Sequence, residues 1–593
     1  MKTTGIATYA DTPSSSENSM AAATASAHTM LHTDSHVTLP RDCNQALGLA
    51  HYALDFMWAQ PKQEGYADPD QVVIQRTELF HTDASLCGVS ALALGTNAPN
   101  LLRREALLYG VPIGAGAGTL APMFGSKQHG ATVFGSPVHV QPEKAIVANC
   151  AAVREWDSNG TNFGYNPTLG HIAGEFGHND FYSVPIAAAQ LAGLDGWAAL
   201  KGMILLDEIR GRLAEVFSLK TYKIDHVVHG AIASAATFGA MLKATPEQIE
   251  SAIGMAVAHY IPFRAIRAGK QLSDSKGASA AISTEAAILS MKRSMMGFLG
   301  PRDIFRNPEA FFRIFEGPGQ MFVATRKASA YAASNGHHAE RGGTPYASPF
   351  DLVLGKSGKD FAVMGMHFKL GLYEHQSAGA LQGLVDLINK TPALLDDPKG
   401  GNIASMIVTA YEPAFGIIGD PAKRDPKTRQ SADHSMLYLV CTKLRKALEA
   451  RQKGARSFDF KSLMLLPHDF SASAISHPVT RALMEKMTFR HGGEDYDRRY
   501  PDGIPTSIQI TAADGTEHDS GLVMYPTGHA RNNTADLPDI LAHKFRMLGA
   551  LATGGDEPAA RGLVDRYSKM GKKLAADVAD LHNFHLVVRD RFE

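Results

Sequence analysis

The chain has 593 residues, which is enough for more than one domain and a sizeable hydrophobic core. Its 45% hydrophobic and 20% charged residues are ordinary for a soluble globular protein. The formal net charge of −1 offers no electrostatic footprint for nucleic acid or an anionic membrane. No apolar stretch reaches the roughly 18 residues that a membrane span requires. We therefore expect a soluble intracellular protein with no nucleic-acid or membrane partner.

The cysteines exclude several kinds of site. Four are scattered along the chain without a CxxC motif or a cluster: Cys43, Cys87, Cys150 and Cys441. This pattern argues against an iron–sulfur cluster, a cysteine-based zinc site and a disulfide framework, and it suits a reducing compartment.

The first forty residues are rich in Ser, Thr and Ala and nearly free of bulky apolar side chains. Residues 1–40 are therefore predicted to form a disordered arm. A mitochondrial presequence is rich in Ser but also in Arg, and it is poor in acidic residues. This arm has no Arg before Arg41 and carries Asp11, Glu17 and Asp34. A cytoplasmic location is expected, with the mitochondrial matrix as the alternative.

From about Pro40 to Gly300, apolar residues recur at helical spacing, as in DCNQALGLAHYALDFM, SVPIAAAQLAGL and TPEQIESAIGMAVAHY. Thr245 and Gln248 have the spacing of a capping box at the start of the last of these helices. Strands are hard to find in this part of the sequence. It is predicted to form a large all-α bundle.

One polar segment interrupts this helical pattern, from Arg154 to Asp180 (REWDSNGTNFGYNPTLGHIAGEFGHND). Its charged and Gly-rich sequence lies between two apolar, Ala-rich stretches and cannot be buried without partners for its polar groups. We expect it to line a cavity, with Asp157 and His178 as a candidate acid/base pair. The alternative is an ordinary helix–helix loop.

Two further clusters follow the polar segment. Asp225, His226 and His229 stand at the start of an apolar helix, but no third ligand with convincing spacing supports a zinc site there. Arg264 and Arg267 precede Lys276 and a run of small residues, a pattern that suits an anionic substrate close to a helix start. The alternative for these cations is a solvated basic loop.

After Pro301 the sequence changes character. Turn-rich segments lead to alternating runs such as IASMIVTAY and TSIQITAA, which are interleaved with the helical patterns GALQGLVDLIN and SMLYLVCTKLRKALEA. This arrangement predicts a mixed α+β domain. The last part of the chain, beginning at PDILAHKFRMLGALA, returns to a helical pattern.

Taken together, several ordered blocks resemble the MmgE/PrpD family, the 2-methylcitrate dehydratase family that also includes cis-aconitate decarboxylases and an iminodisuccinate epimerase. The blocks are ATVFGS, AIVANCAAVREWDSNGT, GHND, IDHVV, KGASAAIS, HFKLGLYEHQSAGA, ADHSMLYLV and YPTGH. The resemblance covers nearly everything from about Asp42 to His582. It rests on the order and spacing of the blocks rather than on any single one.

The resemblance implies a mostly α fold, in which a large all-α domain built from both chain ends carries a smaller inserted α+β lid domain. The expected boundaries are 41–365 for the first part of the helical domain, 366–526 for the lid and 527–593 for the C-terminal helical part. It also implies a homodimer, a small tricarboxylate as substrate, and catalysis without a metal, flavin or nucleotide cofactor.

The family's site residues transfer onto this chain where the blocks match. As the resemblance implies, the catalytic residues are Asp157, His178, His226, Lys276 and Tyr438, and the substrate-binding residues are Thr161, Arg264, Arg267 and Lys369. The cations would neutralise a tricarboxylate, a histidine or aspartate would take the α-proton, and a second acid would protonate the leaving hydroxyl. Lys369 and Tyr438 would close over the substrate and exclude water.

Three departures from the family pattern concern the substrate. His178-Asn179-Asp180 replaces the family's His-Pro-Ser-Asp, the loop between Thr161 and His178 is longer than expected, and LGLYEHQ follows Lys369 in place of a Tyr/Phe-Pro run. His171, on the longer loop, competes with His178 for the acid/base role.

The expected reaction is dehydration of 2-methylcitrate or a related alkyl citrate to the alkyl aconitate. The spacing of Arg264, Arg267 and Lys276 resembles the dehydratase pattern, whereas family decarboxylases carry small apolar residues there. The alternatives are decarboxylation of cis-aconitate to itaconate and a non-catalytic homologue that acts as a binding module.

Overall fold

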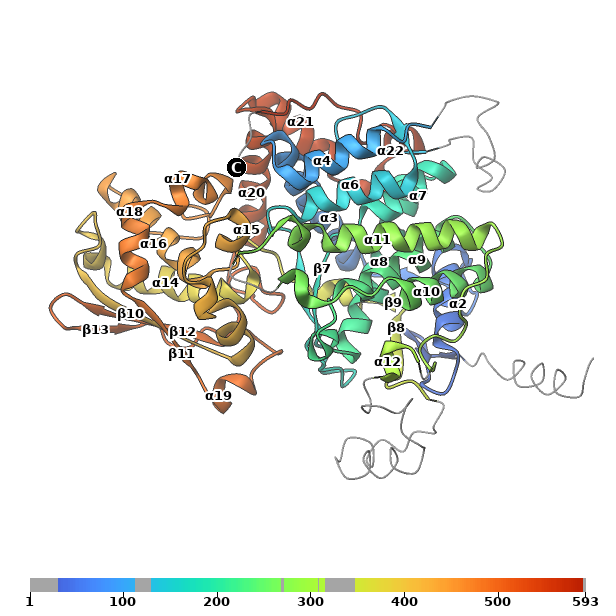
Figure 1. Cartoon of the computed structure of the whole chain (residues 1–593), viewed down its shortest axis with the longest axis horizontal. Coiled ribbons are helices and arrows are strands. Elements are labelled where there is room, and N and C mark those ends of the chain that lie inside the picture. Colours follow the sequence, from blue (N-terminus) through green and yellow to red (C-terminus); the bar gives the residue numbers. More distant parts are fainter. Residues whose placement is uncertain (1–29, 112–129, 268–270, 308, 315–346, 590–593) are drawn as a thin grey trace, which may run out of the picture.

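The structure is a computed structural model that describes residues 30–111, 130–267, 271–307, 309–314 and 347–589 (Figure 1). Helices dominate it, as the sequence predicts, and the sheets are small. Among the described helices, none combines the length and apolarity needed to cross a membrane.

The helical half is built around one buried helix. Helix α9 (Val227–Met241) is buried along its whole length and packs against α8 (Gly196–Val216), α10 (Pro246–His259) and α11 (Asp274–Met295). Small residues along α9 allow this close approach, since a side chain at Gly239 would meet Ile249 of α10 and Met291 of α11. The capping box of Thr245 and Gln248 is confirmed at the start of α10.

Further helices complete this half. Helix α11 also packs against α6 (Pro142–Arg154), which in turn contacts α3 (Gln71–Ala93) and α7 (Ser183–Ala192). The remaining helices are α2 (Gln45–Trp58), α4 (Asn97–Leu107) and α12 (Phe311–Ile314).

The mixed half follows in the chain and lies beside the helical half (Figure 1). Its sheet has the order β11-β10-β12-β13, in which β10 runs parallel to β11 and antiparallel to β12. The strands are β10 (Ile403–Ala410), β11 (Met487–His491), β12 (Thr506–Ala512) and β13 (Glu517–Asp519). Both strands predicted from alternation, β10 and β12, therefore lie at the centre of this sheet.

Helices cover this sheet. Helix α14 (Ala378–Lys390) packs on β12, and α16 (Met436–Gln452) packs against α14 and α18 (Pro478–Glu485). The shorter helices here are α15 (Arg429–Ala432), α17 (Ala472–Ile475) and α19 (Glu494–Asp497).

The C-terminal helices return to the helical half. Helix α20 (Leu537–Thr553) packs against α3 and α21 (Glu557–Tyr567), and α22 (Ala575–Ala579) packs against α7. Lys544 on α20 is buried and forms an ion pair with Asp83 of α3 at 2.6 Å. Its ammonium also donates to the carbonyls of Ser158 (2.6 Å) and Lys369 (2.7 Å). One C-terminal side chain thus ties together segments from three parts of the chain.

Short strands also occur outside the sheet of the mixed half. β1 (Leu31–His32) and β2 (His36–Leu39) pair with each other, and β2 pairs with β8 (Leu352–Gly355). Of the predicted disordered arm, residues 1–29 lie outside the described residues, whereas its end is ordered because Val37 and Leu39 are buried. The other short pairs are β3 (Asp68–Pro69) with β9 (Ser357–Gly358) and β4 (Ala131–Thr132) with β5 (His139–Val140).

Candidate active site

The polar segment between α6 and α7 folds into a buried hairpin. Strand β6 (Thr161–Phe163) pairs antiparallel with β7 (Phe176–His178), and Thr161 stands opposite His178 in the register. The long loop that separates these residues in sequence therefore brings them together in space. A further bridge between Asn166 and His171 extends the hairpin toward its tip.

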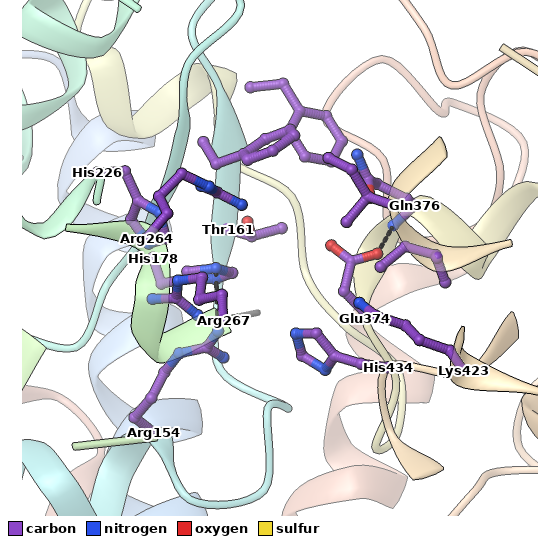
Figure 2. Close-up of a pocket in the computed structure, with 14 residues that line it drawn as sticks. Arg154, Thr161, His178, His226, Arg264, Arg267, Glu374, Gln376, Lys423 and His434 are labelled. Atoms are coloured by element: carbon purple, nitrogen blue, oxygen red, sulfur yellow. Dashed lines mark hydrogen bonds between the residues drawn. The ribbon is translucent and has the colours of Figure 1, made fainter. Parts of the chain in front are cut away.

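A small cavity, with about 50 Å³ accessible to the centre of a water molecule, lies between this hairpin and the mixed half. Figure 2 shows cations and imidazoles of the helical half on one wall, facing side chains of the mixed half on the other. The lining residues are Arg154, Thr161, Phe163, Phe176, His178, His226, Arg264, Arg267, Glu374, Gln376, Ile417, Ile418, Lys423 and His434.

The structure sorts the nine predicted site residues into three groups. Five line the cavity: Thr161, His178, His226, Arg264 and Arg267. Three lie in a buried ionic network beside it: Asp157, Lys276 and Lys369. Tyr438 belongs to neither group, because its hydroxyl donates to the backbone carbonyl of Asp469. The competing His171 lies outside the cavity lining and pairs with Glu215 at 3.1 Å.

Asp157 is the centre of the ionic network. Its carboxylate is fully buried and contacts Arg154 and Lys369 directly, with the ammonium of Lys276 at 3.6 Å. Burial alone would raise its pKa, but the charges of Arg154, Lys369 and Lys276 outweigh that effect and hold the pKa of Asp157 well below its ordinary value. Asp157 is therefore ionised at neutral pH and serves to hold cations in place.

The same network extends to the mixed half. Lys276, near the start of α11, donates to Asp433 at 2.9 Å, and His434 lies 3.2 Å from Asp157 through its Nδ1. Burial lowers the pKa of Lys369, although Asp157 acts in the opposite direction. The two halves of the molecule are thus joined by charge pairs next to the cavity.

The two predicted histidines lie close together, with ring centroids 5.2 Å apart. Burial lowers the pKa of both His178 and His226 well below the ordinary value, and Arg154 acts in the same direction. Both rings are therefore neutral at pH 7 and able to accept a proton.

Their hydrogen bonds differ. Arg154 lies 3.1 Å from Nε2 of His178, and because a guanidinium can only donate, this nitrogen accepts and the ring proton resides on Nδ1. His226 has no hydrogen-bond partner on either nitrogen within the described residues, and its Nδ1 lies 3.6 Å from the carboxylate of Asp225. His226 is thus the histidine with a free acceptor nitrogen.

Asp225 also fixes one of the cavity cations. It accepts from Arg267, with one oxygen 3.1 Å from Nη2, whereas Arg264 has a buried nitrogen with no hydrogen-bond partner within the described residues. Both arginines lie on a short 3₁₀ turn, Arg264–Arg267. Arg264 therefore has a guanidinium nitrogen left for a bound anion.

The cavity wall formed by the mixed half contains residues that were not among the predicted site residues. Glu374 and Gln376 precede α14, Ile417 and Ile418 lie on a π-helical turn (Ala414–Ile418), and Lys423 follows that turn. Arg154 and His434 were likewise not selected, although both stand in recognised blocks. Three of these residues could have been found from the sequence, because Arg154, Glu374 and His434 each lie within five residues of a predicted site residue.

A metal ion does not suit this site. Asp157, Asp433 and His434 offer ligand atoms within 4.8 Å of one another, which is the spacing of a cation site. These carboxylates are already neutralised by Lys276, Lys369, Arg154 and Arg429. A divalent cation would have to displace a buried ammonium at a large electrostatic cost.

These features define a mostly helical protein with a cavity lined by several cations between a helical and a mixed half. Its sequence matches the MmgE/PrpD N-terminal domain over residues 66–322 and the MmgE/PrpD C-terminal domain over residues 460–566. The chain belongs to the MmgE/PrpD family, which confirms the resemblance noted from the sequence blocks.

Curated relatives are similar at modest identity. A 2-methylcitrate dehydratase from Cupriavidus necator is 25% identical over 513 residues, which cover 81% of this chain and 90% of that protein. A mitochondrial 2-methylcitrate dehydratase from Yarrowia lipolytica is 27% identical over 396 residues, covering 63% of this chain and 65% of that protein. A 2-methylcitrate dehydratase from Escherichia coli K12 is 24% identical over 446 residues, covering 72% and 78%.

Proposed function

We propose that the protein is a cofactor-independent hydro-lyase that dehydrates 2-methylcitrate or a related alkyl citrate to the corresponding alkyl aconitate. The observation that most strongly supports the proposal is a cavity lined by several cations and two neutral imidazoles. The names of the relatives support the same substrate class.

The cations would bind the substrate and stabilise the transition state. Arg154, Arg264 and Lys423 line the cavity and can each face a substrate carboxylate, while Arg267 is held by Asp225. Removing a proton next to a carboxylate builds negative charge, which positioned cations stabilise inside a site that excludes water. The apolar side chains of the lining would contact the alkyl substituent.

His226 is the better candidate for the base that removes the proton. Its ring is neutral, it has a free acceptor nitrogen, and Asp225 would stabilise the imidazolium that forms. His178 is held by Arg154 and would donate from Nδ1 to the substrate. Asp157, Lys276 and Lys369 would fix the charges around the site, and Tyr438 would have no direct role.

The proposal also includes a domain arrangement and an oligomeric state. The mixed half would act as a lid on a helical body to which both chain ends contribute, and the active form would be a homodimer. The contacts of α20 with α3 and the position of the cavity between the halves support this division.

Decarboxylation of cis-aconitate is the second candidate. Unlike dehydration, it expels carbon dioxide and needs no leaving hydroxyl. Arg264 on the cavity wall favours dehydration, because the family decarboxylases are expected to carry small apolar residues at that position. A binding module without activity is the third candidate. The neutral histidines and the unpaired guanidinium nitrogen of Arg264 argue against it.

We expect the purified protein to form an unsaturated product from 2-methylcitrate without releasing carbon dioxide. The measurement is absorbance of the alkene together with carbon dioxide release, with 2-methylcitrate, citrate and cis-aconitate as substrates. The rate should survive exhaustive chelation, because lysine and arginine side chains neutralise the carboxylates that a metal would need. Carbon dioxide release from cis-aconitate would support decarboxylation, and no turnover of any of the three would support a binding module.

A further inference from the structure

The only carboxylate among the described lining residues of the cavity is Glu374. Two backbone contacts hold it in place. Its N–H donates to the carbonyl of Asp433 at 3.0 Å, and its Oε2 accepts from the N–H of Gln376 at 2.7 Å. Figure 2 shows its carboxyl group facing across the cavity toward Arg264 and Thr161.

The other oxygen of this carboxyl group is available. No hydrogen bond reaches Oε1 of Glu374 within the part of the chain that the structure describes. Because Oε2 and the backbone are held, Oε1 occupies a defined position on the wall opposite His226. A carboxyl oxygen in this position can reach the face of a bound substrate that His226 does not.

The surroundings of Glu374 favour its protonated form. Burial raises its pKa to about 7, and Asp157 acts in the same direction while Lys369 and Lys423 oppose them. The charged and titratable groups that interact with it are Lys369, Asp157, Lys423, Tyr411 and Tyr500. Those that line the same cavity are Arg154, His178, His226, Arg264, Arg267 and His434. At neutral pH a large fraction of Glu374 therefore carries a proton.

The other lining groups are poorer proton donors. Burial lowers the pKa values of His178 and His226, and it lowers the pKa of His434 to about 3, so these imidazoles carry no dissociable acidic proton at neutral pH. Burial lowers the pKa of Lys423 to about 8, but this ammonium is needed to neutralise a substrate carboxylate.

We propose that Glu374 is the catalytic acid that gives its proton to the departing hydroxyl of the substrate. The inference rests on the proposed dehydration. The base takes the proton from carbon, the C–H electron pair becomes the C=C bond, and the C–O bond breaks. The carboxyl proton of Glu374 joins the hydroxyl, water leaves, and Glu374 remains as a carboxylate. Proton exchange with solvent from the imidazolium and to Glu374 restores the starting state.

The test uses leaving groups that differ in their need for a proton. The substrates are 2-methylcitrate and the analogue in which fluorine replaces the hydroxyl, and fluoride release is read with an electrode. Glu374→Gln should lower kcat for 2-methylcitrate by about 10²- to 10⁴-fold, which is the usual contribution of a positioned proton donor. It should lower fluoride elimination less than about tenfold, because fluoride leaves with little help from an acid.

The pH profile gives a second readout. A donor must be protonated, so activity of the wild type on 2-methylcitrate should fall as pH rises through the pKa of Glu374, near 7. Glu374→Asp should keep this falling limb with a lower kcat, and Glu374→Gln should lose it. The matched control is Glu485→Gln, an exposed residue at the end of α18, which should leave both substrates and the pH profile unchanged.

Equal losses on both substrates, or no loss on either, would overturn the role of Glu374 as the acid. Circular dichroism of each variant establishes whether it is folded. If Glu374→Gln does not fold, the pH profile of Glu374→Asp is the test: loss of its falling limb would contradict the role of Glu374. A wild-type protein that leaves 2-methylcitrate unchanged but eliminates fluoride would contradict the proton donor. A wild-type protein inactive on both compounds would contradict the proposed function itself.

Discussion

Replacing His226 with alanine should lower kcat for dehydration by about two to four orders of magnitude, the usual contribution of a positioned base. His226 has a free acceptor nitrogen on the cavity wall, and Asp225 lies 3.6 Å from its other nitrogen. The fold should persist, because a cavity-lining ring contributes little to core packing. Steady-state kinetics with 2-methylcitrate and a thermal melt of the variant measure both effects.

His171→Ala is the matched control for this histidine. His171 pairs with Glu215 and does not line the cavity, so its removal should change kcat less than about threefold. His178→Ala should lie between the two, because Arg154 occupies its acceptor nitrogen. An inactive His171→Ala together with a healthy His226→Ala would show that the reaction takes place elsewhere.

Asp157→Asn should destabilise the protein by about 3–5 kcal/mol, the usual cost of breaking a buried ion pair from one side. The change leaves Arg154 and Lys369 without their shared carboxylate, while Lys276 keeps Asp433. Asp157 has a φ of 50°, and asparagine tolerates this left-handed backbone, so the change isolates the charge. Denaturant unfolding at pH 7 measures the effect, and kcat should fall as well.

The lowered pKa of Asp157 also predicts how the free energy of unfolding changes with pH. The folded-state pKa of Asp157 lies below its unfolded value, so its contribution is present above about pH 4 and is lost as pH falls through the folded pKa. Wild type should therefore lose more stability on acidification than Asp157→Asn.

The control is Asp495→Asn, an exposed aspartate paired with Arg498, which should cost less than about 1 kcal/mol. Similar losses for both variants would contradict a central role for Asp157.

The sequence was a good guide to the helices and to one wall of the site. Alternating or helical periodicity predicted β10, β12, α14 and α16, because each buries one face along a continuous run. The pairs β3–β9 and β4–β5 could not be predicted, since strands of two residues are set by a distant partner rather than by local pattern. The pairing of Thr161 with His178 could not be predicted either, because their strands are short and a long loop separates them in sequence.

The opposite wall of the site was harder to predict from sequence. Tyr438 matches a family block, yet Ser435 caps α16 in front of it and places His434, outside the helix, beside Asp157. Glu374 lies in the family block HFKLGLYEHQSAGA, in which only Lys369 received a role. Lys423 follows a π-helical turn and had no signal, because its position depends on how the mixed half packs against the hairpin.

Hydrogen exchange tests the location of the site most directly. The inactive variant His226→Ala is labelled with and without 2-methylcitrate, so that the ligand stays bound during labelling. Slower exchange is expected on both walls, at residues 161–163 and 176–178 of the hairpin and at 414–418 and 423 of the mixed half. No protection, or protection confined to the separate cavity around Tyr165 and Arg531, would contradict the account.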